Sequence, residues 1–212
     1  MSYYIFLENN KLNGAGQCIV VDEDMESLEV TEEVYNAFVE NPDKYVYQDG
    51  EIVENPNYKQ EKLQQAKETK LKEILDKAYK YENKTGLVSF DGRVSETETQ
   101  VLHTELFNQS KFFQMVIGFS QGVLTGDQLY NTKEDINVLI NSEEAQAIYF
   151  AIKNATEKLW TVDYLYYKKL IEQAETVEDV ESVVVDYTVG YVEDTGNVEE
   201  TTENSSVVEQ GD

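Results

Sequence analysis

The chain has 212 residues, enough for one ordinary domain or two small ones, and its 42 acidic and 17 basic residues give a formal net charge of −25. Nucleic-acid binding depends on Lys and Arg side chains that neutralise phosphates, so this charge argues against a nucleic-acid partner and against docking on an anionic bilayer. Arg93 is the one arginine in the chain, so bidentate recognition of phosphate or carboxylate groups has almost no residue to use.

Hydropathy and cysteine content further limit the location of the chain and its covalent cross-links. No stretch approaches the roughly 20 apolar residues that span a bilayer, and residues 1–7 lack the positive region that opens a signal peptide. We therefore expect no membrane partner and synthesis in the cytoplasm. Cys18 is alone, which excludes an intrachain disulfide, and its apolar neighbours at 19–21 predict a buried side chain.

The first module, residues 1–57, is expected to be a small docking unit of strands, one helix and a hairpin. The predicted elements are strands at 2–7 and 17–21 joined by a turn at 9–16, a helix at 31–39, and a hairpin at 45–53. Thr31 is suited to cap the helix, and Pro42 ends it because proline disfavours a helical residue before it. Asp49–Gly50 favours the type I′ turn of the hairpin.

An acidic segment, residues 22–33, is the best candidate for a metal site. The residues whose spacing is similar to that of a calcium-binding loop are Asp22, Asp24, Glu26 and Glu33. Ser27 stands where such a loop needs glycine for its sharp turn, so we favour an acidic surface loop ahead of a capped helix. The sequence leaves open whether the segment binds a cation, and we expect no cofactor and no metal.

Residues 58–85 are predicted to form a helix that connects two modules. It is expected to run from about Pro56 to Glu82, with Asn55 as its cap and the proline at its first position. Its first half is polar on most faces, which favours a solvated spacer, and half of an oligomeric coil is the alternative. The apolar residues that continue at helical spacing through its second half are Leu71, Ile74, Ala78 and Tyr81.

The C-terminal module, residues 86–187, is predicted to combine short antiparallel hairpins with two long helices. The expected order is a hairpin at 87–95 that turns at Asp91–Gly92, a helix at 96–117, glycines at 118, 122 and 126, a strand pair at 128–130 and 136–140, a helix at 141–174, and a last turn at 177–184. The first helix is expected to bury one face that holds Val101, Leu102, Leu106, Phe113 and Val116. Asn141 and Glu144 have the spacing of a capping box, and Thr176 is suited to cap the last turn.

These elements together predict an α+β fold with antiparallel strand pairing. Residues 188–212 carry acidic side chains and no Lys or Arg, and they cannot bury enough apolar surface to become ordered alone. We expect an acidic tail that is disordered unless a partner binds it.

The chain carries few residues suited to catalysis. His103, the one histidine, is expected on a helix between Leu102 and Leu106, which favours a packed or surface role over that of a base. No Gly-x-Ser-x-Gly elbow, Walker loop or dinucleotide loop is present. Two carboxylates can serve a glycosidase, but carboxylates are too numerous here to single out a pair, and no array of Trp and Arg marks a sugar site. We expect no enzymatic activity.

The order strand, turn, helix, hairpin and long helix over residues 86–176 resembles an uncharacterised domain that recurs in tail-fibre, baseplate and tail-assembly proteins of tailed bacteriophages. The resemblance covers about half the chain, roughly residues 71–184, and the segments that carry it are 78–81, 86–90, 126–139 and 171–178. Residues 49–58 are also similar to segments that precede a helix in many phage tail proteins. The resemblance implies no catalytic residues.

The resemblance implies a non-enzymatic structural component of a tailed-phage virion, in the tail, the baseplate or a tail-fibre appendage. Its partners would be other tail or baseplate proteins, and copies of itself in a symmetric oligomer such as a trimer. The alternatives are a tail-fibre assembly chaperone that is absent from the mature virion, and a module that binds or cleaves host glycans. Of 15 tyrosines, the ones expected at an interface are Tyr79, Tyr81, Tyr164, Tyr166 and Tyr167.

Overall fold

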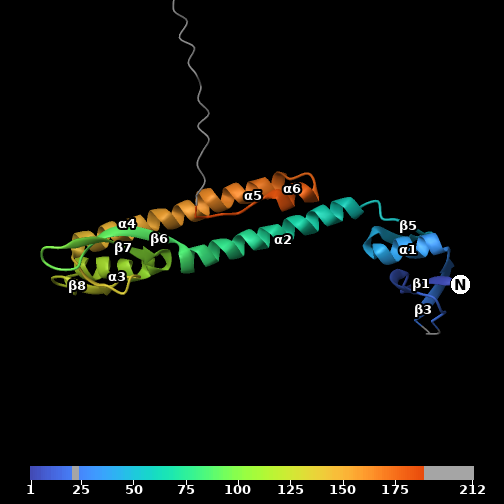
Figure 1. Cartoon of the computed structure of the whole chain (residues 1–212), viewed down its shortest axis with the longest axis horizontal. Coiled ribbons are helices and arrows are strands. Elements are labelled where there is room, and N and C mark those ends of the chain that lie inside the picture. Colours follow the sequence, from blue (N-terminus) through green and yellow to red (C-terminus); the bar gives the residue numbers. More distant parts are fainter. Residues whose placement is uncertain (21–23, 189–212) are drawn as a thin grey trace, which may run out of the picture.

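The structure is a computed structural model that describes residues 1–20 and 24–188. Its helices and antiparallel sheets follow one another along one long axis, with the N-terminal unit at one end and a four-stranded sheet at the other (Figure 1). The predicted α+β class is confirmed. Within these described residues, no helix is both long enough and apolar enough to cross a membrane.

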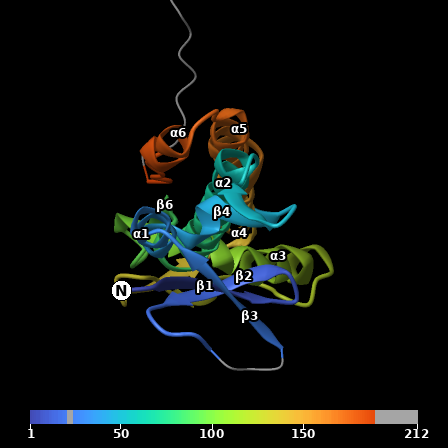
Figure 2. The ribbon, with the colours of Figure 1, turned by 90° about the vertical axis from the view of Figure 1, so that its right-hand side faces the viewer.

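A three-stranded antiparallel sheet forms the N-terminal unit, with β1 (Tyr3–Glu8) between β2 (Lys11–Gly16) and β3 (Met25–Val30) (Figure 2). The predicted strand at 17–21 is wrong over 17–20, and residue 21 lies outside the described residues. The chain turns back earlier, at Asn9–Asn10. Both asparagines have positive φ, 54° and 60°, as a two-residue hairpin turn requires.

The glycines of β2 fit this strand to a large neighbour. A Cβ added at Gly16 would lie 2.9 Å from Cζ of the Phe6 ring, and one added at Gly14 would lie 3.6 Å from Cδ2 of the same ring. Glycine therefore allows the buried Phe6 ring to pack closely against the strand. Because glycine is typical of turns, the sequence predicts a turn over 9–16, but the structure turns only at 9–10 and forms a strand over 11–16.

Helix α1 (Glu32–Glu40) packs on this sheet and completes the small core of the unit. Thr31 caps the helix as predicted, because its hydroxyl accepts a hydrogen bond from a backbone N–H of the first turn at 3.3 Å. Phe38 is buried, and the Tyr35 ring centroid lies 4.9 Å from that of Tyr3 on β1.

The predicted hairpin of the N-terminal unit is confirmed. A short 3-10 turn, η1 (Pro42–Lys44), leads into β4 (Tyr45–Gln48), which pairs with β5 (Glu51–Glu54). The turn residues Asp49 and Gly50 have φ values of 53° and 91°, and an Asp-Gly pair adopts these left-handed values readily.

Helix α2 (Tyr58–Lys80) continues into one π-helical turn, η2 (Tyr81–Thr85). It starts two residues later than predicted, with Asn57 at the N-cap and Pro56 outside the helix. Asn55 does not cap the helix. Its Oδ1 accepts a hydrogen bond from the Asn57 N–H at 2.9 Å and shapes the turn that precedes the helix.

The prediction that α2 is a solvated spacer is wrong, because the helix packs along α5 (Tyr164–Gln173) and α6 (Val177–Ser182) (Figure 1). The side chains that α2 contributes to the core are Leu63, Ala66, Leu71, Ile74 and Ala78. Lys67 donates a hydrogen bond to the Glu172 carbonyl at 2.8 Å, near the end of α5. The polar residues of α2 therefore lie beside the apolar contact that this helix makes with α5 and α6.

The predicted hairpin turn at Asp91–Gly92 is wrong, since β6 (Leu87–Arg93) runs through both residues. β6 pairs along its length with β7 (Thr99–Glu105). Gly92 serves close packing instead, because a Cβ there would lie 2.6 Å from Cδ1 of Leu102 and 3.1 Å from Cγ1 of Val138.

The predicted helix at 96–117 is wrong over its first half. In β7 the side chains alternate, so that Leu102 is buried while Val101 is exposed, contrary to the expected helical face. A 3-10 turn, η3 (Leu106–Asn108), follows, and the helix begins only with α3 (Gln109–Ser120). The sequence predicts one long helix because the apolar residues of β7 and α3 also fit helical spacing.

The predicted second strand pair is confirmed as β8 (Gln128–Asn131) and β9 (Asn137–Ile140). In this pair Gln128 lies opposite Ile140, and Asn131 lies opposite Asn137. β9 joins β6 where Leu139 pairs with Arg93, so the four-stranded sheet has the order β7-β6-β9-β8.

The long C-terminal helix is confirmed with one interruption. A second π-helical turn, η4 (Leu159–Asp163), joins α4 (Ser142–Lys158) to α5. Asn141 and Glu144 form the predicted capping box: the Glu144 N–H donates to Asn141 Oδ1 at 3.0 Å, and the Asn141 N–H donates to Glu144 Oε2 at 2.7 Å.

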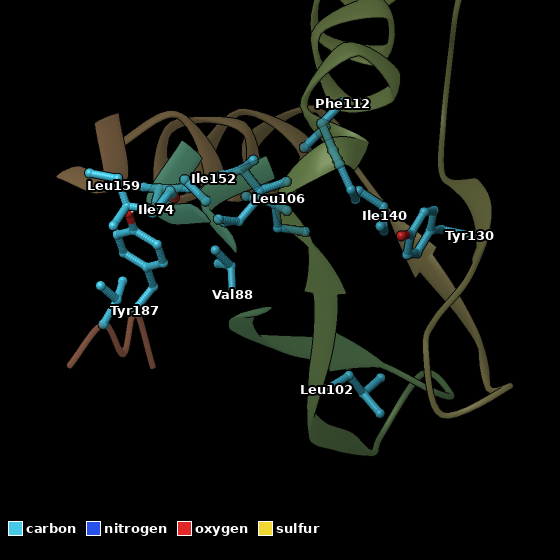
Figure 3. Packing of buried hydrophobic residues seen from close by; sticks show 14 of the residues in the cluster. Ile74, Val88, Leu102, Leu106, Phe112, Tyr130, Ile140, Ile152, Leu159 and Tyr187 are labelled. Atoms are coloured by element: carbon cyan, nitrogen blue, oxygen red, sulfur yellow. Dashed lines mark hydrogen bonds between the residues drawn. The ribbon is translucent and has the colours of Figure 1, made fainter. Parts of the chain in front are cut away.

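α6 and the residues after it complete the core. Thr176 caps α6 as predicted, in a capping box with Asp179. One hydrophobic cluster then runs from α2 through the sheet to the C-terminal helices. Figure 3 shows one end of this cluster at Ile74, Leu159 and Tyr187, and the other end at Phe112, Tyr130 and Ile140.

Candidate interaction surface

The five tyrosines expected at an interface lie where α2 ends beside the C-terminal helices. Two are near the end of α2 and in η2, and three are in α5: Tyr79, Tyr81, Tyr164, Tyr166 and Tyr167. Trp160 in η4 links the two groups, because its ring centroid lies 4.9 Å from that of Tyr79 and 5.6 Å from that of Tyr164. The fold therefore brings together aromatic residues that are far apart in the sequence.

Tyr187 completes this group, although the sequence did not single it out. Its ring centroid lies 5.5 Å from that of Tyr167 and 6.2 Å from that of Tyr81. The ring is buried, and its hydroxyl donates a hydrogen bond to the Ile74 carbonyl at 3.0 Å. We call the five tyrosines, Trp160 and Tyr187 the tyrosine cluster.

Burial raises the pKa of Tyr187 above its usual range, and the neighbouring Tyr164 and Tyr167 add to this effect. Tyr187 therefore acts as a neutral hydrogen-bond donor in the folded chain. The signal that could have found it is the alternation over 183–187, where side chains at odd positions face the core and those at even positions face solvent.

Most of the tyrosine cluster is used inside the chain. Tyr79 is exposed, whereas the other four predicted tyrosines are only partly exposed. The Tyr167 hydroxyl donates to the Asp186 carbonyl and accepts from the Asp186 N–H, at 3.2 Å in both cases. These contacts fasten α5 to the segment that follows α6. Binding of another molecule by these tyrosines stays a prediction.

Arg93 holds three parts of the C-terminal module together. Its guanidinium donates to both carboxylate oxygens of Glu144, at 2.7 and 2.9 Å, and to both of Asp127, at 3.1 and 2.9 Å. Hydrogen bonds from Arg93 lower the pKa of Glu144 and that of Asp127 below their usual values. Because Glu144 also belongs to the capping box of α4, Arg93 ties β6 to the start of that helix.

His103 lies on β7, so its predicted position on a helix is wrong. Its ring Nδ1 pairs with a carboxylate oxygen of Glu134, and its backbone N–H donates to the other oxygen at 3.3 Å. The Lys133 N–H donates to the His103 carbonyl at 3.4 Å. The turn between β8 and β9 thus covers part of the outer edge of β7, which leaves less open backbone on an edge strand.

The acidic segment at 22–33 does not assemble a metal site in its described part. Asp22 lies outside the described residues, and residues 25–30 form β3, so the prediction of a surface loop is wrong there. Across residues 1–20 and 24–188, no group of three or more His, Cys, Asp and Glu side chains is placed to hold a metal ion. The prediction that Cys18 is buried is also wrong, because the strand ends at Gly16 and leaves Cys18 exposed.

An exposed apolar surface lies where α3 packs on α4. Phe113 and Ile117, four residues apart on α3, are 47% and 38% exposed, so the prediction that Phe113 is buried is wrong. The Phe113 ring centroid lies 5.6 Å from that of Tyr149 on α4. Tyr149 lies 5.4 Å from Phe150, which is 48% exposed. We call these four residues, with the exposed Gln114, Ala147 and Ala151 beside them, the α3–α4 face.

The α3–α4 face lacks the acidic charge of the rest of the chain. About one residue in five of the whole chain is acidic, but residues 106–126 and 145–156 contain no Asp or Glu. Each stretch has one cation, Lys111 or Lys153. Lys111 Nζ lies 4.4 Å from the centroid of a buried tyrosine ring, and Lys153 is paired with Glu157 at 2.8 Å. This gap is a sequence signal for the face, but residues 9–21 also lack Asp and Glu, so the gap alone does not identify it.

A family model matches the N-terminal part of the chain. Residues 19–62 match a family described as a protein of unknown function, DUF2977. The match covers about a fifth of the chain, from before β3 into the start of α2, so the tyrosine cluster and the α3–α4 face lie outside it. No curated protein and no solved structure matches the chain.

Proposed function

We propose that the chain is a non-enzymatic docking protein that serves as a structural component of a tailed-phage virion, in the tail, the baseplate or a tail-fibre appendage. The observation that carries the docking role is the α3–α4 face, because exposed aromatic surface without charge is typical of the centre of protein interfaces. The resemblance of residues 86–176 to a domain of phage tail proteins supports the viral setting. The partners are other tail or baseplate proteins and further copies of the chain itself.

The arrangement of the elements also supports a docking role. The N-terminal unit and the C-terminal sheet with α3 lie at opposite ends of the long axis (Figure 1). Between them α2 has 23 residues, or about 35 Å of helix, and its packing against α5 and α6 stiffens it. A chain built in this way can hold two neighbouring subunits at a set distance.

Mass spectrometry of purified particles of the virus that encodes the chain tests this proposal. We expect the chain in a fixed ratio to the tail or baseplate proteins, and we expect Phe150→Glu to remove it from the particles. Leu165→Glu is the matched control, because Leu165 is 49% exposed on α5 and lies outside the α3–α4 face. Particles that assemble only when the chain is made, yet do not contain it, would contradict the structural role and favour an assembly chaperone.

A further inference from the structure

Charge determines which surface of this chain another copy can approach. Two molecules that each carry a formal charge of −25 repel one another at long range. The two stretches that build the α3–α4 face, residues 106–126 and 145–156, contain no carboxylate that would add to this repulsion. This face therefore brings no like charges of its own into a contact between two copies.

The same pattern argues against a partner selected by charge. A basic protein would be drawn to the acidic surfaces elsewhere on the chain, where its own cations find carboxylates. The α3–α4 face offers such a partner no carboxylate, and its lysines are engaged with Tyr130 and Glu157. It offers half-exposed aromatic rings instead, which an identical uncharged face complements in a two-fold contact.

The exposed area sets the expected strength of the contact. The exposed parts of Phe113, Ile117, Tyr149 and Phe150 amount to about 300 Å² of apolar surface per copy, given the size of such side chains. A standard stable interface buries about 800 Å² per partner. The neighbouring small and amide side chains must therefore join the contact, and the dimer is expected to be weak, as is typical of interfaces below the standard size.

We propose that the α3–α4 face binds the α3–α4 face of a second copy of this chain. This inference rests on the docking role proposed above and names the occupant of the docking surface. The contact is isologous, so Phe113 and Phe150 of one copy pack on the same residues of the other across a two-fold axis. Salt strengthens it, because counterions screen the repulsion between the acidic surfaces that surround the face.

Sedimentation equilibrium of the purified chain across the micromolar range, at low and at high NaCl, tests this proposal. The wild-type chain should form dimers, and they should be tighter at high salt. Phe150→Glu places like charges at the centre of the contact and should weaken association at least about tenfold. Leu165→Glu adds the same charge at a side chain of equal exposure on α5, and it should associate as the wild type does.

Thermal unfolding of each variant checks that the monomer remains folded, and Phe113→Gln provides a second, uncharged disruption of the same face. A wild-type chain that stays monomeric, dimers that dissociate on addition of salt, or equal losses in Phe150→Glu and Leu165→Glu would each overturn the inference. A monomeric chain that is nevertheless found in virus particles overturns the inference alone. A dimer that is absent from the particles overturns the proposed structural role alone.

Discussion

The tyrosine cluster and the α3–α4 face are both rich in aromatic side chains, but they differ in what covers those side chains. In the cluster, Tyr187 lies between Tyr81 and Tyr167, so rings from distant segments bury one another. On the face, Phe113 and Phe150 remain about half exposed. Aromatic content alone therefore does not identify an interface in this chain, because aromatic rings pack inside the chain in one region and stay exposed in the other.

The Tyr187→Ala variant is the strongest test of the difference between the buried tyrosine cluster and the exposed α3–α4 face. The change removes a buried ring and its hydrogen bond to the Ile74 carbonyl, so we expect a loss of about 4 kcal/mol in the free energy of unfolding. Urea unfolding followed by the fluorescence of Trp160, which lies in the cluster, measures it. Tyr187→Phe is the control and should lose about 1 kcal/mol. An alanine variant as stable as the phenylalanine variant would show that the ring does not hold the cluster together.

Arg93→Ala should have the next largest effect. It removes the hydrogen bonds to Glu144 and Asp127, and we expect a loss of about 2 kcal/mol in the free energy of unfolding. Arg93→Lys keeps the charge without the bidentate geometry, so its stability should lie between those of the wild type and the alanine variant. Urea unfolding of the three proteins measures the series. A lysine variant no better than alanine would indicate that geometry, and not charge, is what matters.

The same clamp predicts a pH dependence. Hydrogen bonds from Arg93 lower the folded-state pKa of Glu144 and of Asp127 below their ordinary values of 4.5 and 3.8. A lowered pKa stabilises the fold above the ordinary value, and this stability is lost as the pH falls through the lowered one. Wild-type stability should therefore fall below about pH 4.5, and it should fall less steeply in Arg93→Ala. Urea unfolding at each pH measures the free energy of unfolding of both proteins. An equally steep fall below about pH 4.5 in the two proteins would show that the Arg93 contacts do not cause it.

The smallest effect on stability is expected on the α3–α4 face. Phe150→Ser removes a ring that is about half exposed, so the free energy of unfolding should change by no more than about 1 kcal/mol. Thermal and urea unfolding at a protein concentration low enough to keep the chain monomeric measure this change. A loss of about 3 kcal/mol, as for a core aromatic, would place Phe150 in the core and remove the contrast between the two regions.

Local signals predicted the elements whose ends are defined by neighbours in the sequence. Thr31 and Asn141 cap their helices, and Asp49–Gly50 turns its hairpin, because caps and tight turns use residues only a few positions apart. Gly92 shows the limit of such signals. It has the sequence context of a turn, yet its role is to admit Leu102 and Val138, and neither contact can be read from the residues beside it.

The candidate site shows the same division. The five tyrosines are predicted to contact other subunits, and that role stays a prediction. The fold gathers them within the chain, because helical spacing places Tyr164 and Tyr167 toward one side of α5. Their use inside the chain depends on Tyr187, which lies 113 residues from the Ile74 carbonyl that it contacts. The α3–α4 face was not predicted, because the exposure of Phe113 depends on how α3 packs on α4.

By itself, the sequence determined the acidic character of the chain, its α+β composition, most helix caps and the hairpin turn at Asp49–Gly50. These properties depend on composition and on contacts between residues close in the chain. Only the tertiary structure decided that α2 belongs to the core, that residues 99–105 form a strand, and which aromatic rings stay exposed. The physical reason is that the burial of a side chain depends on which distant segment packs against it. Helical or strand spacing shows which residues share a face, but it does not show what covers that face.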